Sequence, residues 1–157
     1  MKKTQKRTER QIFLRFLFVL YGLAMLWLLF GQRIGTGVSY ADYQNRLESN
    51  INLTPLYTLQ LYWRLLHTST SPGLLRHAVI NLVGNVVMFI PLGIFIPGIF
   101  LKKPNFFKFF FTVAGWIVIV ELLQFFSLLG SCDVDDLILN LCGATIGYIF
   151  WKLRQKN

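Results

Sequence analysis

Long apolar runs dominate this chain and predict four membrane-spanning helices, over residues 12–31, 78–101, 106–129 and 134–151. A helix needs about 20 mostly apolar residues to cross a hydrocarbon layer of ~30 Å. The runs are close to that length, and short connections join the last three of them. The pattern therefore predicts an all-α membrane protein, a bundle of four transmembrane helices with one long loop over residues 32–77.

The long loop contains one helical segment. Thr54 suits an N-cap and Pro55 suits the first helical position. The segment reaches only to Leu66 and is interrupted by Arg64, whereas a span needs roughly 17 to 25 residues. Its tyrosine and tryptophan residues are typical of membrane interfaces, so we predict a short interfacial helix lying along the headgroups.

The first apolar run also admits another interpretation, a cleaved signal peptide, because Ser39, Tyr40 and Ala41 resemble a small-x-small cleavage site. The apolar core of a signal peptide is roughly 7 to 15 residues long, and this run is longer. The cleavage-like triplet also lies far downstream of it. We therefore predict a retained first span.

Composition and charge place the protein in the membrane. The chain has 157 residues, of which 54% are hydrophobic, and its mean hydropathy is +0.50. That is too apolar for a soluble domain of this length. The net charge of +9 comes from basic residues that cluster at the ends of apolar runs, which indicates membrane edges rather than a nucleic-acid partner. We predict one domain, residues 12–151, in contact with membrane lipids.

The same charges predict an orientation. With four spans, the basic tails 1–11 and 152–157 and the connection at Lys102 and Lys103 all fall on one side of the membrane. An excess of Lys and Arg marks the cytoplasmic side. We therefore expect both termini in the cytoplasm and the long loop outside.

Polar side chains converge in the outer half of this predicted bundle. A helical rise of ~1.5 Å per residue places amides of the second, third and fourth spans, together with one carboxylate, at similar depth. Two aspartates of the fourth span lie nearer the outer surface. We predict that these seven residues form a binding site: Asn81, Asn85, Glu121, Gln124, Asp133, Asp136 and Asn140.

Glu121 is the strongest functional candidate among them. A charge at the centre of a bilayer costs about 2.5 to 3.5 kcal/mol on insertion scales, so such residues usually face a bundle interior or an aqueous cavity. The fourth span offers a matching face, because its polar and small residues recur every three or four positions: Asp133, Asp136, Asn140, Gly143 and Gly147. The two glycines allow a close helix contact. Asp135 falls off this stripe, and we expect it to be exposed at the outer interface.

Several interpretations of the polar residues stay open at this point. Amides in spans often serve only as hydrogen-bond links between helices, worth roughly 0.6 kcal/mol each, which would suit a structural partner subunit. An intramembrane enzyme acting on a lipid headgroup would use Glu121 or Asp136 as a general acid or base. No nucleophile-base pair is evident for Ser127 or Ser131. We predict no catalytic residue, no metal site and no cofactor.

Three ordered motifs resemble the VanZ-like family. They are Asn81-Leu-Val-Gly-Asn85 continuing to Phe89-Ile-Pro91-Leu-Gly93, then Glu121-Leu-Leu-Gln124, then Asp133-Val-Asp-Asp136 continuing through Asn140 to Gly143 and Gly147. The upstream Asn52-Leu-Thr-Pro55 also looks like this family. The similarity extends from about residue 50 to residue 148, and the ordered set is more specific than any single motif.

The resemblance implies a small polytopic membrane protein of bacteria, in a family whose founding member is associated with resistance to the glycopeptide antibiotic teicoplanin. It implies no particular chemistry. Many relatives carry Arg where this chain has Gly130, which puts in doubt any charge pair between that position and the nearby aspartates. The hypothesis is an outer-half polar pocket for a lipid-linked cell-wall precursor or a glycopeptide-like molecule.

Overall fold

The computed structural model describes residues 2–31, 51–101, 104–127 and 132–155. Among these residues, four helical segments are long and apolar enough to cross a membrane, which confirms the predicted fold class. The elements in chain order are α1 (Lys2–Leu26) with its π-helical continuation η1 (Trp27–Gly31), β1 (Ile51–Asn52), α3 (Tyr57–Thr68), α4 (Pro72–Phe95) with its π-helical continuation η2 (Ile96–Phe100), α5 (Phe106–Phe126), β2 (Cys132–Asp133) and α6 (Val134–Arg154). The cleavage-like triplet at residues 39–41 and Gly130 lie outside the described residues.

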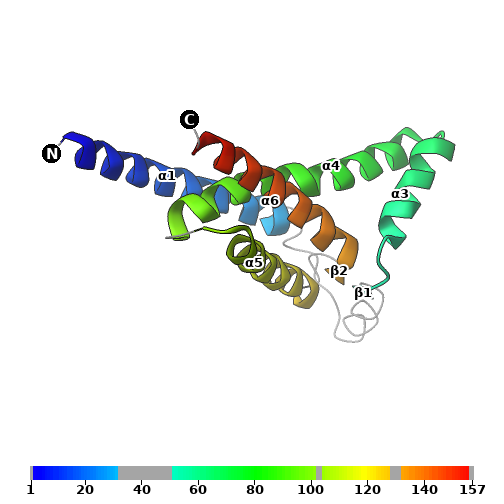
Figure 1. Ribbon diagram of the computed structural model, residues 1–157. Coiled ribbons are helices and arrows are strands. Elements are labelled where there is room, and N and C mark those ends of the chain that lie inside the picture. The colour runs from blue at the N-terminus through cyan, green and yellow to red at the C-terminus, as the bar shows by residue number, and fades with distance from the viewer. Residues whose placement is uncertain (1, 32–50, 102–103, 128–131, 156–157) are drawn as a thin grey trace.

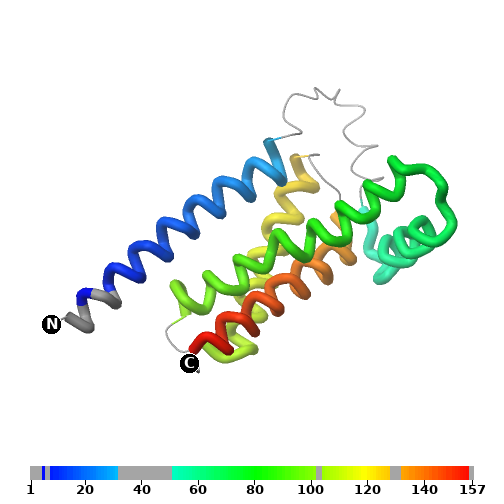
Figure 2. Tube along the Cα trace, turned by 90° about the horizontal axis from the view of Figure 1, so that it is seen from above, coloured from blue at the N-terminus to red at the C-terminus, as the bar shows by residue number. Residues whose placement is uncertain are grey.

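The long helices alternate in direction, and the described N- and C-terminal residues lie toward the same end of the bundle (Figures 1 and 2). We call this end, which carries Lys2 and Arg154, the basic end. The opposite end, where α6 begins after Asp133, is the polar end. The short helix α3 folds back beside the first turns of α4 and projects from the bundle at the polar end (Figure 2).

Glycines hold α4 and α6 in close contact. A Cβ atom added to Gly143 would overlap the carbonyl oxygen of Val86, and one added to Gly147 would overlap that of Ile90. From the other side, Gly93 of α4 lies against the backbone of α6. Small residues allow this backbone approach in a membrane, where helices gain little from apolar burial alone. The predicted packing role of the glycine stripe is confirmed.

The core lies where α4, α5 and α6 meet. Phe109 of α5 stacks on Tyr148 of α6 with ring centroids 4.4 Å apart, and the buried cluster around them also contains Phe89, Val113 and Ile117. By contrast, none of the described side chains of α1 and η1 is buried. The α1 helix therefore lies at the periphery of a three-helix core.

The start of α3 differs from the prediction. The helix begins at Tyr57, and its N-cap is Leu56 in the left-handed conformation with φ of 66° and no side-chain cap. The prediction that Thr54 caps this helix and Pro55 opens it was therefore wrong. A non-glycine residue in this conformation carries strain of about 1 to 3 kcal/mol, which surrounding contacts must offset. Those contacts come from α6.

Candidate functional site at the polar end

The innermost part of the polar end is an amide-carboxylate pair between two helices. The side-chain nitrogen Nδ2 of Asn140 on α6 donates to Oε1 of Glu121 on α5 across 3.2 Å. Both residues are buried, with 7% of Glu121 and 3% of Asn140 exposed. The second polar atom of the amide, Oδ1 of Asn140, is buried and has no hydrogen-bond partner among the described residues. Glu121 and Asn140, which we predicted to lie at a similar depth, are therefore in direct contact.

A second pair links α4 to α6 nearer the surface. Nδ2 of Asn85 donates to Oδ1 of Asp136 across 2.6 Å. One turn earlier on α4, Oδ1 of Asn81 is buried and is likewise without a partner among the described residues. Gln124 is half-buried one turn beyond Glu121, and the hydrogen bonds between described side chains do not join it to the other site residues.

Asp133 organises the start of α6. Its Oδ1 accepts from the backbone N–H of Asp135 across 2.8 Å, which caps the helix as a carboxylate at the N-cap normally does. Its Oδ2 accepts from the hydroxyl of Thr58 at 2.6 Å and from Nδ2 of Asn52 at 3.3 Å. Asp133 therefore joins three segments, and only 8% of it is exposed.

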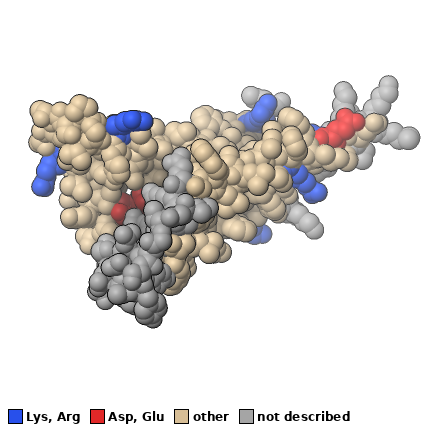
Figure 3. All heavy atoms as spheres, turned by 180° about the vertical axis from the view of Figure 1, so that it is seen from behind, with Lys and Arg blue, Asp and Glu red and all other residues tan. Residues whose placement is uncertain are grey.

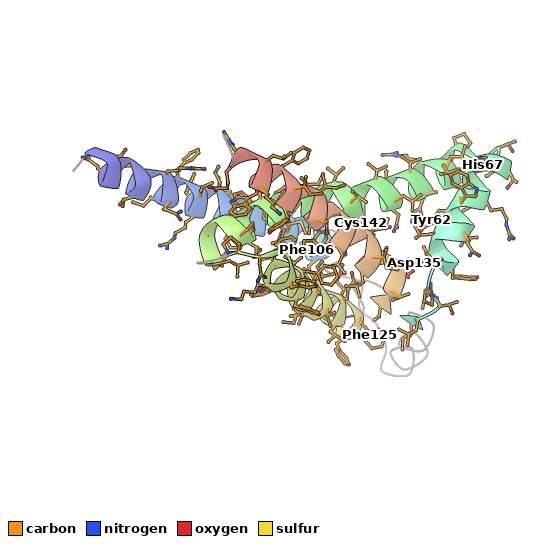
Figure 4. All side chains as sticks on the ribbon, in the orientation of Figure 1. Tyr62, His67, Phe106, Phe125, Asp135 and Cys142 are labelled. Atoms are coloured by element: carbon orange, nitrogen blue, oxygen red, sulfur yellow. The ribbon has the colours of Figure 1, made fainter. Side chains whose placement is uncertain are left out.

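Asp135 binds the N-terminus of α3. Its two carboxylate oxygens accept from the backbone N–H groups of Leu56 at 2.6 Å and Leu59 at 3.0 Å. Helix N-termini present unpaired N–H groups and a positive dipole end, so a carboxylate is favourable there. Figure 4 shows Asp135 at the start of α6 beside the nearest turn of α3. The expectation that Asp135 is exposed was wrong, because it is 0% exposed and supplies the cap that α3 lacks in its own sequence.

Besides Asp135, two residues of this arrangement were not among the predicted site residues, namely Asn52 and Thr58. Both bind Asp133, and Asn52 lies in β1, which pairs in parallel with β2 in the register Asn52 to Asp133. The signal for Asn52 was present in the sequence, in the motif that begins at this residue. Thr58 carried no comparable signal.

Four carboxylates gather at the polar end, and we call Glu121, Asp133, Asp135 and Asp136 the acidic cluster. The donors described above are neutral amides, a hydroxyl and backbone N–H groups. In Figure 3 acidic atoms are visible in a recess beside residues that are not described. Within the described ranges, no set of three or more His, Cys, Asp or Glu side chains is arranged to hold a metal ion.

The electrostatic effect of the cluster extends to neighbours outside the spans. Burial, followed by the charges of Asp136 and Asp133, raises the pKa of the Tyr62 phenol. Burial, followed by the charges of Glu121 and Asp133, raises the pKa of the Cys132 thiol. Both shifts indicate an environment that disfavours further negative charge.

The fold and these contacts define the class as a multi-pass membrane protein with a buried amide and carboxylate cluster at one end of its helix bundle. Residues 18–155 match the VanZ/LLP1 family. The chain belongs to this family, as the resemblance of its motifs indicated. It is 26% identical to Protein VanZ of Enterococcus faecium over 147 residues, which make up 94% of this chain and 78% of that protein. No solved structure matches the chain.

Proposed function

We propose that this bacterial envelope protein binds a lipid-linked or glycopeptide-like molecule in an outer-half polar pocket and thereby contributes to tolerance of glycopeptide antibiotics such as teicoplanin. The observation that carries the proposal is the pair of buried amide oxygens, Oδ1 of Asn81 and Oδ1 of Asn140, that have no partner among the described residues. Leaving a buried acceptor unpaired costs about 1 to 3 kcal/mol. A ligand that donates to these atoms would remove that penalty.

The ligand class follows from the chemistry of the site. Ionised carboxylates only accept hydrogen bonds, and the free ends of the asparagines accept as well. A molecule rich in hydroxyl, amide or amine groups complements such a surface. Lipid-linked cell-wall precursors and glycopeptides both carry these groups. The lipid-linked precursors also have an apolar tail that can pack between membrane helices.

Each predicted residue has a proposed role in the pocket. Glu121 and Gln124 form the floor, and Asp133 and Asp136 line the mouth. The remaining amides supply donors and acceptors along the walls: Asn81, Asn85 and Asn140. The contacts that support these roles are the Asn140–Glu121 and Asn85–Asp136 hydrogen bonds, which join α6 to α5 and to α4 on successive turns of α6.

The proposal places the polar end on the outer side of the membrane and both termini in the cytoplasm. The excess of Lys and Arg at the basic end supports this orientation. Reporter fusions at the N-terminus, at the C-terminus and in the loop of residues 32–50 test it. Activity of a cytoplasmic reporter is expected at both termini, and activity of an external reporter only in the loop.

Tolerance of teicoplanin in cells tests the function. Expressed in a sensitive bacterial host, the wild-type chain is expected to raise the tolerated concentration, and Glu121→Gln and Asn140→Ala are expected to abolish the increase while the protein still accumulates in the membrane. Glu9→Gln is the matched control, because it removes the same charge from an exposed residue at the basic end. Undiminished tolerance in the Glu121 and Asn140 variants would rule out the pocket.

The alternatives give different results in the same variants. If the polar residues only link helices, Glu121→Gln and Asn140→Ala lower the amount of protein in the membrane instead of producing inactive protein. If the chain is an enzyme, purified protein converts a labelled lipid-linked precursor, and Glu121→Gln abolishes that turnover. The proposed binding function predicts normal accumulation and no conversion.

A further inference from the structure

A cavity of about 560 Å³ lies at the basic end, at the other end of the bundle from the acidic cluster. Its walls come from the first turns of the α1 span, from η2 and its flanking residues, and from the last turns of α6. Near this cavity, Nε2 of Gln11 donates to the carbonyl oxygen of Gly98 across 3.4 Å, which joins α1 to η2. The cavity thus forms where the peripheral helix meets the core.

The lining changes from polar to apolar along the helix axes. On α1, Arg10 and Gln11 line the cavity near the start of the apolar span, and Leu14 lines it about one turn further into the span. On α6, Arg154 lines it at the helix end, and Trp151 lines it about one turn deeper. Both helices therefore present cations near the membrane edge and apolar side chains toward the hydrocarbon.

The charged half of the cavity suits an anion with several oxygens. Arg10 and Arg154 are both among its lining residues, and no Asp or Glu is among its described lining residues. A guanidinium binds phosphate oxygens through two parallel N–H bonds, which adds geometry to charge. Basic pockets between transmembrane helices are a recognised way to hold lipid headgroups.

We propose that this cavity binds the phosphate headgroup of an anionic phospholipid. Arg10 and Arg154 hold the phosphate, and the apolar wall formed by residues such as Leu14 and Trp151 packs against the glycerol and the upper acyl chain. The apolar half distinguishes a lipid from a free phosphate compound, because a small hydrophilic anion gains nothing from that wall. The bound lipid would then stabilise the contact of α1 with the core.

Lipid retention by the purified full-length chain tests this site. The protein is equilibrated with equal amounts of phosphatidylglycerol and phosphatidylcholine in detergent, and bound lipid is counted by native mass spectrometry. Wild-type protein is expected to retain phosphatidylglycerol preferentially. The double variant Arg10→Gln/Arg154→Gln is expected to lose about tenfold or more in affinity, since two charge-assisted contacts disappear.

The matched control is Arg15→Gln/Lys152→Gln, which removes two exposed charges from the same helices without touching the cavity lining. It is expected to change affinity by less than about twofold, and an equal loss in the control would overturn the site. Competition with glycerol 3-phosphate tests whether the ligand is a lipid or a soluble phosphate compound. If glycerol 3-phosphate displaces phosphatidylglycerol at equal concentration, the ligand is a soluble phosphate compound and the lipid assignment is wrong.

A milder variant covers the case in which the double variant fails to fold. Arg154→Lys keeps the positive charge and removes the planar pair of donors. The proposal expects about a threefold weaker retention of phosphatidylglycerol from the loss of bidentate binding. Retention equal to that of wild-type protein would contradict a guanidinium-phosphate contact.

Discussion

Helices α6 and α1 both pack against α4, and they do so in different ways. The α6 helix meets α4 backbone to backbone, with Gly143 and Gly147 directly against carbonyl groups of α4. It also binds α4, α5 and α3 through the side chains of its first two turns. The α1 helix contacts α4 through aromatic side chains, with Phe18 5.7 Å from Phe95 between ring centroids. It also donates a hydrogen bond to the middle of α4, from Oη of Tyr21 to the carbonyl oxygen of Met88 at 2.8 Å.

This difference indicates that α3, α4, α5 and α6 form one rigid unit, whereas the position of α1 can change. Close backbone contact and buried hydrogen bonds tolerate little displacement, so α3, α4, α5 and α6 should move together. Side-chain contacts at the periphery tolerate more, and cavities lie along α1: the basic-end cavity, and an apolar one of about 490 Å³ against α4 and α5. We expect the acidic cluster to be rigid and α1 to shift with the surrounding lipid.

Breaking the α4–α6 contact should have the largest effect. Gly143→Leu forces a side chain into the backbone of α4 at Val86, and overpacking of this kind costs about 3 kcal/mol or more where the backbone cannot move. Unfolding in a denaturing detergent titration measures the loss. Gly115→Leu is the control, because a Cβ atom at Gly115 meets nothing within 4 Å. Equal stability of the two variants would contradict the close contact.

Removing the α6–α3 link should have the next largest effect. Asp135→Ala leaves the N–H groups of Leu56 and Leu59 without their carboxylate, at about 1 to 2 kcal/mol for the loss of a helix cap. Hydrogen exchange at these two amides is expected to accelerate strongly, with little change in α5. Asp135→Asn retains one accepting oxygen and should lie between wild type and the alanine variant. Unchanged exchange in Asp135→Ala would show that another group caps α3.

The α1–α4 link should be much weaker. Tyr21→Phe removes the hydrogen bond to Met88 and keeps the ring, so the expected loss is roughly 0.6 kcal/mol. The same detergent titration measures it, with Tyr57→Phe as the control at an exposed tyrosine. A loss as large as that of Gly143→Leu would remove the distinction between the fixed and the adjustable helices.

The smallest effect concerns the field of the acidic cluster. The charge of Glu121 contributes to the raised pKa of Cys132, after burial. Glu121→Gln should therefore lower that pKa, increase the thiolate fraction at pH about 8, and speed alkylation of Cys132 by about twofold. Cys142→Ala gives a background with one reactive thiol, and Glu9→Gln is the control. An unchanged rate would mean that the charge of Glu121 does not affect the pKa of the Cys132 thiol.

Periodicity along the sequence was enough to predict which face of α6 packs against α4 and that Glu121 and Asn140 lie at a similar depth. The stripe on α6 faces its neighbours because residues three and four apart share a face, and the common depth of Glu121 and Asn140 follows from counting residues in antiparallel helices. Both arguments use only local geometry. They succeeded because the rise and the period of an α-helix are the same along most of its length.

Contacts made by the loop could not be predicted in this way. Asp135 lies 79 positions from Leu56, and nothing in the period of α6 indicates that a separate helix will dock on that carboxylate. The capping rule also misplaced the start of α3, since it considers only the residues next to the helix, whereas this cap comes from another helix. The cavity at the basic end could not be predicted either, because it depends on how α1 packs against η2 and α6.

Direct binding to the purified protein tests the central proposal most closely. Teicoplanin and a lipid-linked cell-wall precursor are titrated separately against the chain in lipid nanodiscs, for wild-type protein, Glu121→Gln and the control Glu9→Gln. The account predicts saturable binding of at least one of them, weakened about tenfold in Glu121→Gln through the loss of the buried carboxyl group, and unchanged in the control. Absence of saturable binding by the folded protein, or equal affinity in all three, would contradict it.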